Sequence, residues 1–227
     1  MSSPQLETPS SVDALYYAQG DDVDVNRPVF TGDVFAPHWS PGGDEAAETD
    51  AFIVLQHPCA LRVGGVDLVD PILCARVSQV QGIRTDWAKA PVRQMPLPNL
   101  FADNRPFAAS FTELLLAKRA DLDINKRAAV LSQLGVNLLL QRWVHHNSRV
   151  VVPTMTYNIQ TTGEFEEADL AAEWCAERGA NAEAEFHEWI RDVSPGTALT
   201  RQQQLRDPQT RAAIRRAMTA NLRGLRG

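Results

Sequence analysis

Apolar and polar residues alternate in several short stretches of the first half of the chain. Phe30 to Phe35 alternates between apolar and polar residues, which is typical of a half-buried strand. Ala51 to Leu55 is a short continuous apolar run, and Val66 to Val80 is a longer apolar-rich stretch with Pro71 near its start. Polar clusters and the pair Gly64-Gly65 separate these runs and favour turns. The pattern therefore predicts three early strands.

The pattern is less regular between the third strand and the middle of the chain. Met95 to Leu100 contains two prolines and predicts an irregular passage. Phe107 to Leu116 favours a fourth strand. The three valines from Val150 to Val152, which Pro153 follows, predict a compact final strand.

Helical spacing begins after the fourth predicted strand. Ile124 to Gly135 predicts a short helix with Asn125 as its cap and the glycine just past its end, and Val136 to Val144 continues with an apolar face. Glu164 to Ile190 is alanine-rich and acidic, and we expect a long helix that breaks near residues 179–181. Asp207-Pro208 predicts the start of a last amphipathic helix.

These elements predict an α+β fold in three parts. Residues 1–28 are polar and acidic and predict a flexible leader. Residues 29–160 predict a β-rich body, and residues 161–227 a C-terminal helical region. The N-terminus lacks the basic and apolar regions of a signal peptide, and no apolar run is long enough to span a bilayer. We therefore expect a cytoplasmic protein without a membrane partner.

Charge is distributed unevenly along the 227 residues. The net charge is −6, but the segment from Thr200 to the C-terminus holds seven arginines and one aspartate, which leaves −12 for the remainder. The three cysteines are scattered and form no CxxC pair, so neither a disulfide framework nor a thiolate zinc site is expected. Cys74 and Cys175 lie in apolar patterns and predict core positions. The sequence predicts no metal and no cofactor.

The turn His57-Pro58-Cys59 ends the second predicted strand. A histidine beside a thiol makes a workable nucleophile, because an imidazolium lowers the thiol pKa, and Arg62 could lower it further. The other interpretation is structural: His57 hydrogen-bonds the backbone at a strand end and Cys59 packs. Both interpretations remain open.

A second polar cluster precedes the three valines. On a helix, Arg142, His145, His146 and Arg149 would cover one face. Two arginines and two histidines suit a phosphate group, because guanidinium groups bind its oxygens and a histidine moves a proton. A metal site is weaker, since it lacks a third ligand. The other interpretation is a solvated polar segment beside a core Trp143.

The last predicted helix carries arginines beside its apolar stripe. Three targets fit them: nucleic acid phosphates, an acidic partner protein, or the chain's own acidic helix from Glu164 to Glu188. The arginines assigned to nucleic-acid or partner binding are Arg206, Arg211, Arg215, Arg216 and Arg223, together with Arg62 from the body.

Three segments follow one another along the chain in an order that resembles the order of elements in a known family. Gly32-Asp33-Val34 opens a strand, Asp70 to Ser78 forms a later strand, and Lys126 to Gly135 precedes the closing strands. From Phe30 to Pro153 this order resembles the body of the MazF/PemK-like toxin family. The resemblance implies a small SH3-like β-barrel with an inserted short helix, a homodimer, and RNA cleavage at a groove on the barrel.

The leading hypothesis is therefore a bacterial barrel protein of toxin–antitoxin or phage-defence type that associates with nucleic acid, RNA above all. A metal-independent endoribonuclease would use His145 or His146 as general base and Arg142 or Arg149 to stabilise the phosphate. The alternative is a non-enzymatic adaptor that docks a partner through its C-terminal helices. A third hypothesis is thiol chemistry at Cys59. The catalytic hypotheses expect the His57 turn and the cluster from Arg142 to Arg149 to converge on one surface.

Overall fold

The computed structural model describes residues 5–37, 51–89, 91–179 and 182–225. The chain divides into two compact units, and each is described by itself. The first unit comprises residues 1–25 and 29–158, and the second comprises residues 26–28 and 159–227. Most of the connection between the first two predicted strands, and residues 180–181 of the predicted helix break, lie outside the described residues.

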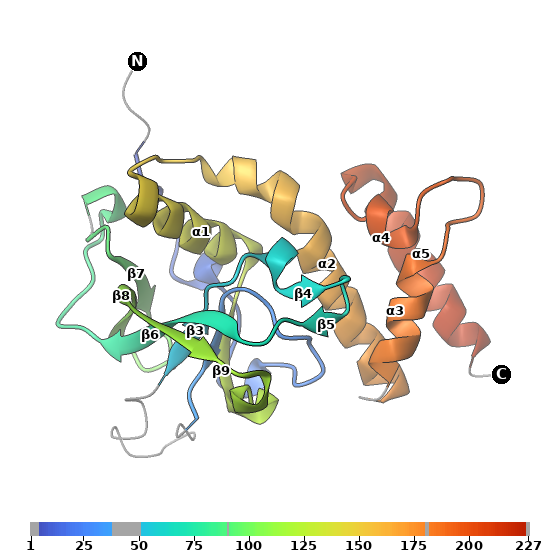
Figure 1. Ribbon diagram of the computed structural model, residues 1–227, viewed down its shortest axis with the longest axis horizontal. Helices are drawn as coiled ribbons and strands as arrows, with labels where there is room; N and C mark the ends of the chain where they lie inside the picture. The colour runs from blue at the N-terminus through green and yellow to red at the C-terminus, as the bar shows by residue number, and fades with distance from the viewer. Residues whose placement is uncertain (1–4, 38–50, 90, 180–181, 226–227) are drawn as a thin grey trace. The chain divides into compact units, whose positions relative to one another are not determined.

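The first unit is built on a seven-stranded antiparallel sheet that curls into a half-barrel (Figure 1). The strand order is β1-β9-β2-β3-β6-β8-β7, and a separate hairpin joins β4 to β5. The α+β class is therefore confirmed. The strands are β1 (Tyr16–Gln19), β2 (Asp33–Phe35), β3 (Phe52–Val54), β4 (Arg62–Val63), β5 (Asp67–Leu68), β6 (Ile72–Gln79), β7 (Gln94–Pro98), β8 (Pro106–Ala117) and β9 (Arg127–Leu131).

The two outer strands of the sheet, β1 and β7, are linked by side chains. The Tyr16 hydroxyl donates to the Pro98 carbonyl at 2.9 Å. The Gln19 amide donates to the carbonyls of Asn99 and Leu100, at 2.6 and 3.1 Å. These bonds satisfy groups at the end of β7 without a continuous ladder, so they hold the curl of the half-barrel.

The early strands lie in the core, and β2 is buried more fully than the half-buried strand that its pattern predicts, because every residue of β2 and β3 is buried. Phe35, Phe52, Val54 and Cys74 belong to one buried cluster. The rings of Phe35 and Phe52 stack with their centroids 5.6 Å apart. The three early strands are thus confirmed as β2, β3 and β6, and the strand predicted from Phe107 is confirmed as β8.

The predicted helix from Ile124 to Gly135 is wrong, and with it the inserted short helix. Residues 127–131 form the strand β9, which lies between β1 and β2, and all five are buried. A strand buried on both faces is apolar throughout, so its pattern cannot be distinguished from a short buried helix. Ser132 then caps α1 (Gln133–Ser148) by accepting the Gly135 amide. Gly135 therefore lies in the first turn of α1 and not past the end of a helix. Glycine is required at this position, because a Cβ there would be 2.3 Å from the Leu15 carbonyl oxygen.

Three further predictions fail because partners from elsewhere in the chain decide the structure. The leader predicted over residues 1–28 contributes β1, which pairs with β9. The proline-rich passage from Met95 forms β7, an outer strand whose prolines need no donor on the open side. The valines from Val150 to Val152 lie in a connection between α1 and α2 and form no strand.

The second unit is mainly helical. Its helices are α2 (Thr154–Arg178), α3 (Glu183–Arg191), α4 (Arg201–Gln204) and α5 (Pro208–Gly224). The first turn of α2 belongs to the first unit, and the rest of α2 belongs to the second. Asp207 caps α5 with Pro208 at the first helical position, which confirms the predicted start. The buried face of α5, with Ile214 and Met218, packs in one cluster with Trp174.

Candidate functional site

The turn from His57 to Cys59 begins where β3 ends. The amide of Gln56 donates to the carbonyl of Leu73 in β6 at 3.1 Å, which is the last main-chain bond before the turn. The single 3-10 turn Pro58–Ala60 follows. Proline suits its first position, because its φ is fixed and no amide donor is required there. The end of a buried strand therefore presents His57 and Cys59 in one tight turn.

The side chains of His57 and Cys59 face each other within this turn. Nδ1 of His57 lies 2.9 Å from Sγ of Cys59 and also accepts the Cys59 amide hydrogen at 3.3 Å. A ring nitrogen that accepts a hydrogen bond carries no proton, so the neutral tautomer with its proton on Nε2 fits this geometry. Burial lowers the pKa of His57, which keeps the ring neutral at pH 7. The pair is a thiol beside a histidine base.

The structure combines parts of both interpretations of this turn. His57 does bond to the backbone at a strand end, as the structural interpretation expects. Cys59 does not pack; it is exposed, whereas Cys74 and Cys175 are buried as predicted. Burial raises the pKa of Cys74 to about 12. Cys59 is therefore the accessible thiol of the chain.

Arg62, which follows the turn in β4, is engaged with main-chain carbonyls. Its guanidinium donates to the carbonyl of Val66 at 2.6 Å and to that of Val29 at 3.3 Å. These bonds join the β4–β5 hairpin to the segment before β2. Arg62 is half-buried, and its two hydrogen bonds give it a structural role in holding this hairpin.

Arg142 lies inside the first unit and not on a polar face. It is 0% exposed. Its guanidinium donates to the carbonyls of Gln94, Trp87 and Pro91, at 3.0, 3.2 and 3.2 Å. Burial lowers the pKa of Arg142 to about 10, so it remains charged at neutral pH. This arginine fastens the segment before β7 to α1, and a phosphate could reach it only if that segment moved.

The other members of the predicted cationic cluster have different environments. His146 stacks on Trp143, with centroids 5.9 Å apart and 15° between the ring planes. Both His145 and His146 are half-buried, and among the described residues their Nδ1 atoms have no hydrogen-bond partner. Arg149 ends α1 in the left-handed conformation, with φ 61°, and is exposed. The four side chains therefore do not form one open cationic face.

The two polar segments do not converge. Figure 1 shows the short turn that precedes β4 beside that strand, whereas the last turn of α1 lies at the far end of the helix. Arg142, the first member of the second segment, donates to the Trp87 carbonyl and not toward the His57 turn. The expectation that the His57 turn and the cluster of residues 142–149 share one surface is therefore wrong.

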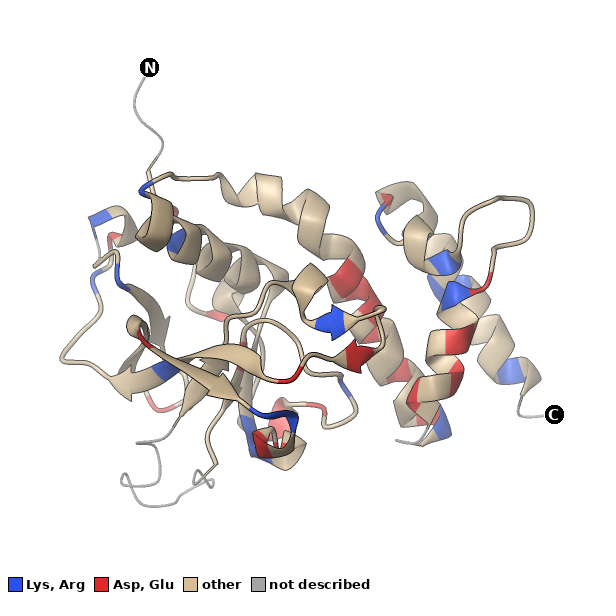
Figure 2. Ribbon diagram, in the orientation of Figure 1, with Lys and Arg blue, Asp and Glu red and all other residues tan. Residues whose placement is uncertain are grey.

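The C-terminal arginines meet the acidic face of α2 within the second unit. Figure 2 shows basic residues along α5 and acidic residues along α2. Arg215 pairs with Glu166 at 3.2 Å and with Glu173. Burial opposes its charge, yet these bonds raise the pKa of Arg215 above its ordinary value. Arg206 pairs with Glu164 at 3.6 Å. Docking on the chain's own acidic helix is thus confirmed for these two arginines.

The remaining arginines of α5 are distributed around the helix. Arg211 is half-buried and donates to the carbonyl of Leu205 at 2.8 Å, so it helps to close the turn before the helix. Arg216 and Arg223 are exposed. These two arginines are the ones in this helix that an external partner could reach without disturbing the fold.

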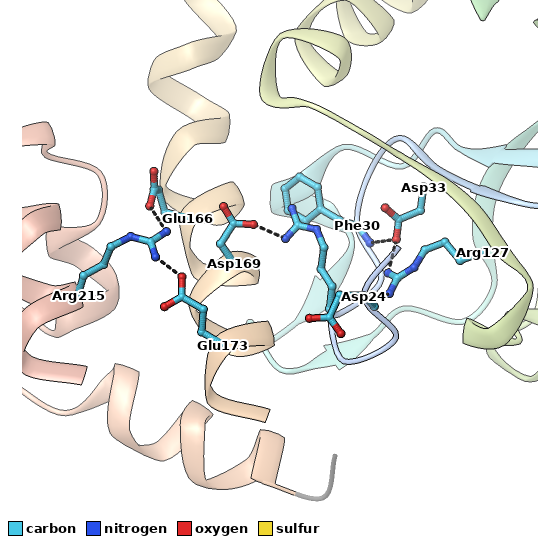
Figure 3. Close-up of polar contacts among 9 residues, drawn as sticks. Asp24, Phe30, Asp33, Arg127, Glu166, Asp169, Glu173 and Arg215 are labelled. Carbon is cyan, nitrogen blue, oxygen red and sulfur yellow. Dashed lines mark hydrogen bonds and ion pairs between the residues drawn. The ribbon is translucent and has the colours of Figure 1, made fainter. Parts of the chain in front are cut away.

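A buried ion pair that the sequence did not single out joins the neighbouring strands β2 and β9. Arg127 donates to Asp33 at 2.8 Å, and both side chains are 0% exposed (Figure 3). Asp33 also accepts the amide of Phe30 at 3.0 Å, and Arg127 donates to the carbonyl of Asp24 at 2.7 Å. The sequence feature that could have revealed this pair is a charged residue at the first position of each strand, Asp33 in β2 and Arg127 in β9. The two residues meet only because β2 lies next to β9.

Comparisons with known proteins do not assign this chain to a family. No family model, no curated protein and no solved structure matches it. In the part of the chain that the structure describes, no three histidine, cysteine or acidic side chains are grouped to hold a metal ion. No helix among those residues has the length and apolar character needed to cross a membrane. The resemblance to MazF/PemK-like toxins, with its SH3-like barrel, stays a prediction.

Proposed function

We propose that the protein acts through nucleophilic thiol chemistry at Cys59, with His57 as the base. The observation that supports this proposal is the 2.9 Å contact between Nδ1 and Sγ at an exposed turn. General bases must lie within hydrogen-bond reach of the proton that they remove, and this one does. A single 3-10 turn, capped by His57, holds both residues a short distance after β3, so local hydrogen bonds fix their geometry.

The reaction would be a direct displacement at a disulfide sulfur, or addition followed by elimination at an acyl carbon. The thiol proton moves from Sγ to Nδ1 of His57, and the sulfur electron pair forms a bond to an electrophilic carbon or sulfur of the substrate. The leaving group departs with the electrons of the bond that breaks, and it takes the proton from the imidazolium. The substrate is an electrophile that can reach an exposed turn, such as an activated acyl group or a disulfide.

Alkylation kinetics test this proposal directly. With iodoacetamide at pH 7, we expect Cys59 to be labelled much faster than Cys74 and Cys175, as measured by peptide mass spectrometry. His57→Ala should slow labelling of Cys59 about tenfold or more, because a general base contributes about 10²–10⁴-fold. His145→Ala is the matched control and should leave the rate unchanged. Equal rates in the wild type and in His57→Ala would overturn the proposal.

A second candidate function depends on Arg216 and Arg223, which α5 exposes. They support the nucleic-acid-associated function that the sequence predicts, of toxin–antitoxin or phage-defence type, because exposed guanidinium groups bind phosphates. Anisotropy with a mixed-sequence single-stranded RNA should show binding that weakens as salt rises. Arg216→Glu with Arg223→Glu should abolish it, whereas Lys89→Glu, at an exposed site of the first unit, should not.

The same RNA experiment separates the remaining alternatives. Cleavage that disappears when His145 and His146 are both changed to Ala would support the endoribonuclease version. Absence of any RNA binding would remove the nucleic-acid function. An acidic protein that co-purifies with the wild type but not with the Arg216→Glu, Arg223→Glu variant would support the adaptor function.

A further inference from the structure

The second half of β8 has a neighbouring strand on one side only. β7 pairs with residues 106–110 of β8 and then ends. β6 continues along the other side as far as Ala117. Among the described residues, no strand covers the open side of residues 112–116. Two large apolar side chains of this segment are exposed: Leu114 by 45% and Leu116 by 65%.

The hydrogen-bond pattern shows which main-chain groups face the open side. The Leu73 carbonyl of β6 accepts the Leu55 amide, so Leu73 faces β3. Its neighbour Cys74 therefore faces β8, where its partner is Leu115. Because successive residues of a strand face opposite sides, the amides and carbonyls of Leu114 and Leu116 point to the open edge. Four main-chain groups are thus available to one further strand.

The other edges of this sheet are protected more fully than residues 114–116 of β8. β7 carries Pro96 and Pro98, which have no amide hydrogen to offer. The short strand β1 bonds through its side chains to the end of β7. A β-bulge and Glu113 interrupt the first part of the open edge, but residues 114–116 are three leucines and contain no proline, charge or bulge. Natural sheets protect exposed edges against unwanted pairing, so an unprotected apolar edge indicates a surface that has a partner.

We propose that the partner is a second copy of this chain, paired antiparallel along β8 about a two-fold axis at Leu115. In this register Leu114 of one copy lies opposite Leu116 of the other, and the reverse pair completes the interface. Both residues face the edge, so each of the two pairs exchanges two main-chain hydrogen bonds. A two-fold axis requires a self-complementary strand, and this segment satisfies that condition.

The charges of the edge are compatible with self-pairing. Glu113 would lie opposite Ala117 of the partner and not opposite its own counterpart. Within each copy, Arg76 of β6 lies 3.7 Å from the Glu113 carboxylate and offsets its charge. No like charges therefore face each other across the interface, and cross-strand leucine pairs stabilise it. The resulting dimer goes beyond the thiol chemistry proposed above and does not depend on it.

Sedimentation velocity over a dilution series of the full chain tests the proposal. The wild type should reach twice the monomer mass at high concentration and dissociate on dilution. Leu114→Lys with Leu116→Lys should be monomeric under the same conditions, because lysines would lie opposite each other in both pairs. Val63→Lys is the matched control, since Val63 is also 65% exposed on a strand, and it should dimerise like the wild type.

A charge-swap variant tests the register. In Leu114→Glu with Leu116→Lys, the proposed register places glutamate opposite lysine in both pairs and should restore the dimer. A register centred on Leu114 would place glutamate opposite glutamate and should not. A wild type that is monomeric at every concentration would overturn the proposal, and so would a dimer that survives both lysines. Failure of the charge swap would overturn the register.

Discussion

The Asp33–Arg127 pair provides a stringent test of how this fold is held together. Replacing Asp33 with alanine leaves the guanidinium of Arg127 buried without its carboxylate, and it removes the acceptor of the Phe30 amide. In an effective dielectric of about 20, opposite charges 2.8 Å apart attract by about 6 kcal/mol. Desolvation offsets much of this in the intact pair, but loss of one partner typically costs about 3–5 kcal/mol.

We therefore expect Asp33→Ala to lower the free energy of unfolding by about 4 kcal/mol. Typical domains have about 5–15 kcal/mol in total, so this loss would be a large share of the stability of the protein. Urea unfolding followed by far-ultraviolet circular dichroism measures this quantity from the midpoint and slope. Asp86→Ala is the control, because Asp86 pairs with Lys89 in solvent, and its midpoint should not move.

A double variant separates loss of the pair from loss of packing. Asp33→Ala with Arg127→Met replaces both charges by apolar groups and should recover most of the stability, since no uncompensated charge remains. If Asp33→Ala alone cost less than about 1 kcal/mol, the guanidinium would have to find water or another acceptor. That result would refute the placement of the pair in a closed interior.

Three further predictions concern other parts of the fold. Burial opposes the ionisation of Glu7, but hydrogen bonds from Thr154 lower its pKa below the ordinary 4.5. The stabilisation of the folded state by ionised Glu7 is thus complete above pH 4.5, and it is lost as the pH falls through the lowered pKa. Glu7→Gln should lower the urea midpoint at pH 7, and the midpoint of this variant should fall less than that of the wild type as the pH is lowered. Deleting residues 200–227 removes the buried face of α5, so a fluorescent apolar dye should bind the truncated chain. Gly135→Ala should destabilise the first unit by about 1–3 kcal/mol in the same urea assay, because the new Cβ meets the Leu15 carbonyl oxygen.

Short-range patterns were sufficient for several elements of this protein. The long run before Val80 corresponds to β6, in which buried and less buried residues alternate, whereas the stretch from Phe30 to Phe35 contains β2, whose three residues are all buried. Asp207-Pro208 marked the start of α5 by a local cap. The turn of His57 and Cys59 was also local: two residues separated by a proline at a strand end need no distant partner to approach each other.

Contacts between distant residues decided the rest. The strand β9 is buried on both faces, so its apolar run carried no period that distinguishes strand from helix. Arg142 is directed inward because three carbonyls from residues 87–94 surround its guanidinium, and nothing near it in the sequence signals them. The sequence alone determined that a histidine and a thiol follow one strand end, and the structure showed that their side chains are in contact. Only the tertiary structure decided which arginines are buried and which strand edge is left open, because both depend on elements that meet only after the chain has folded.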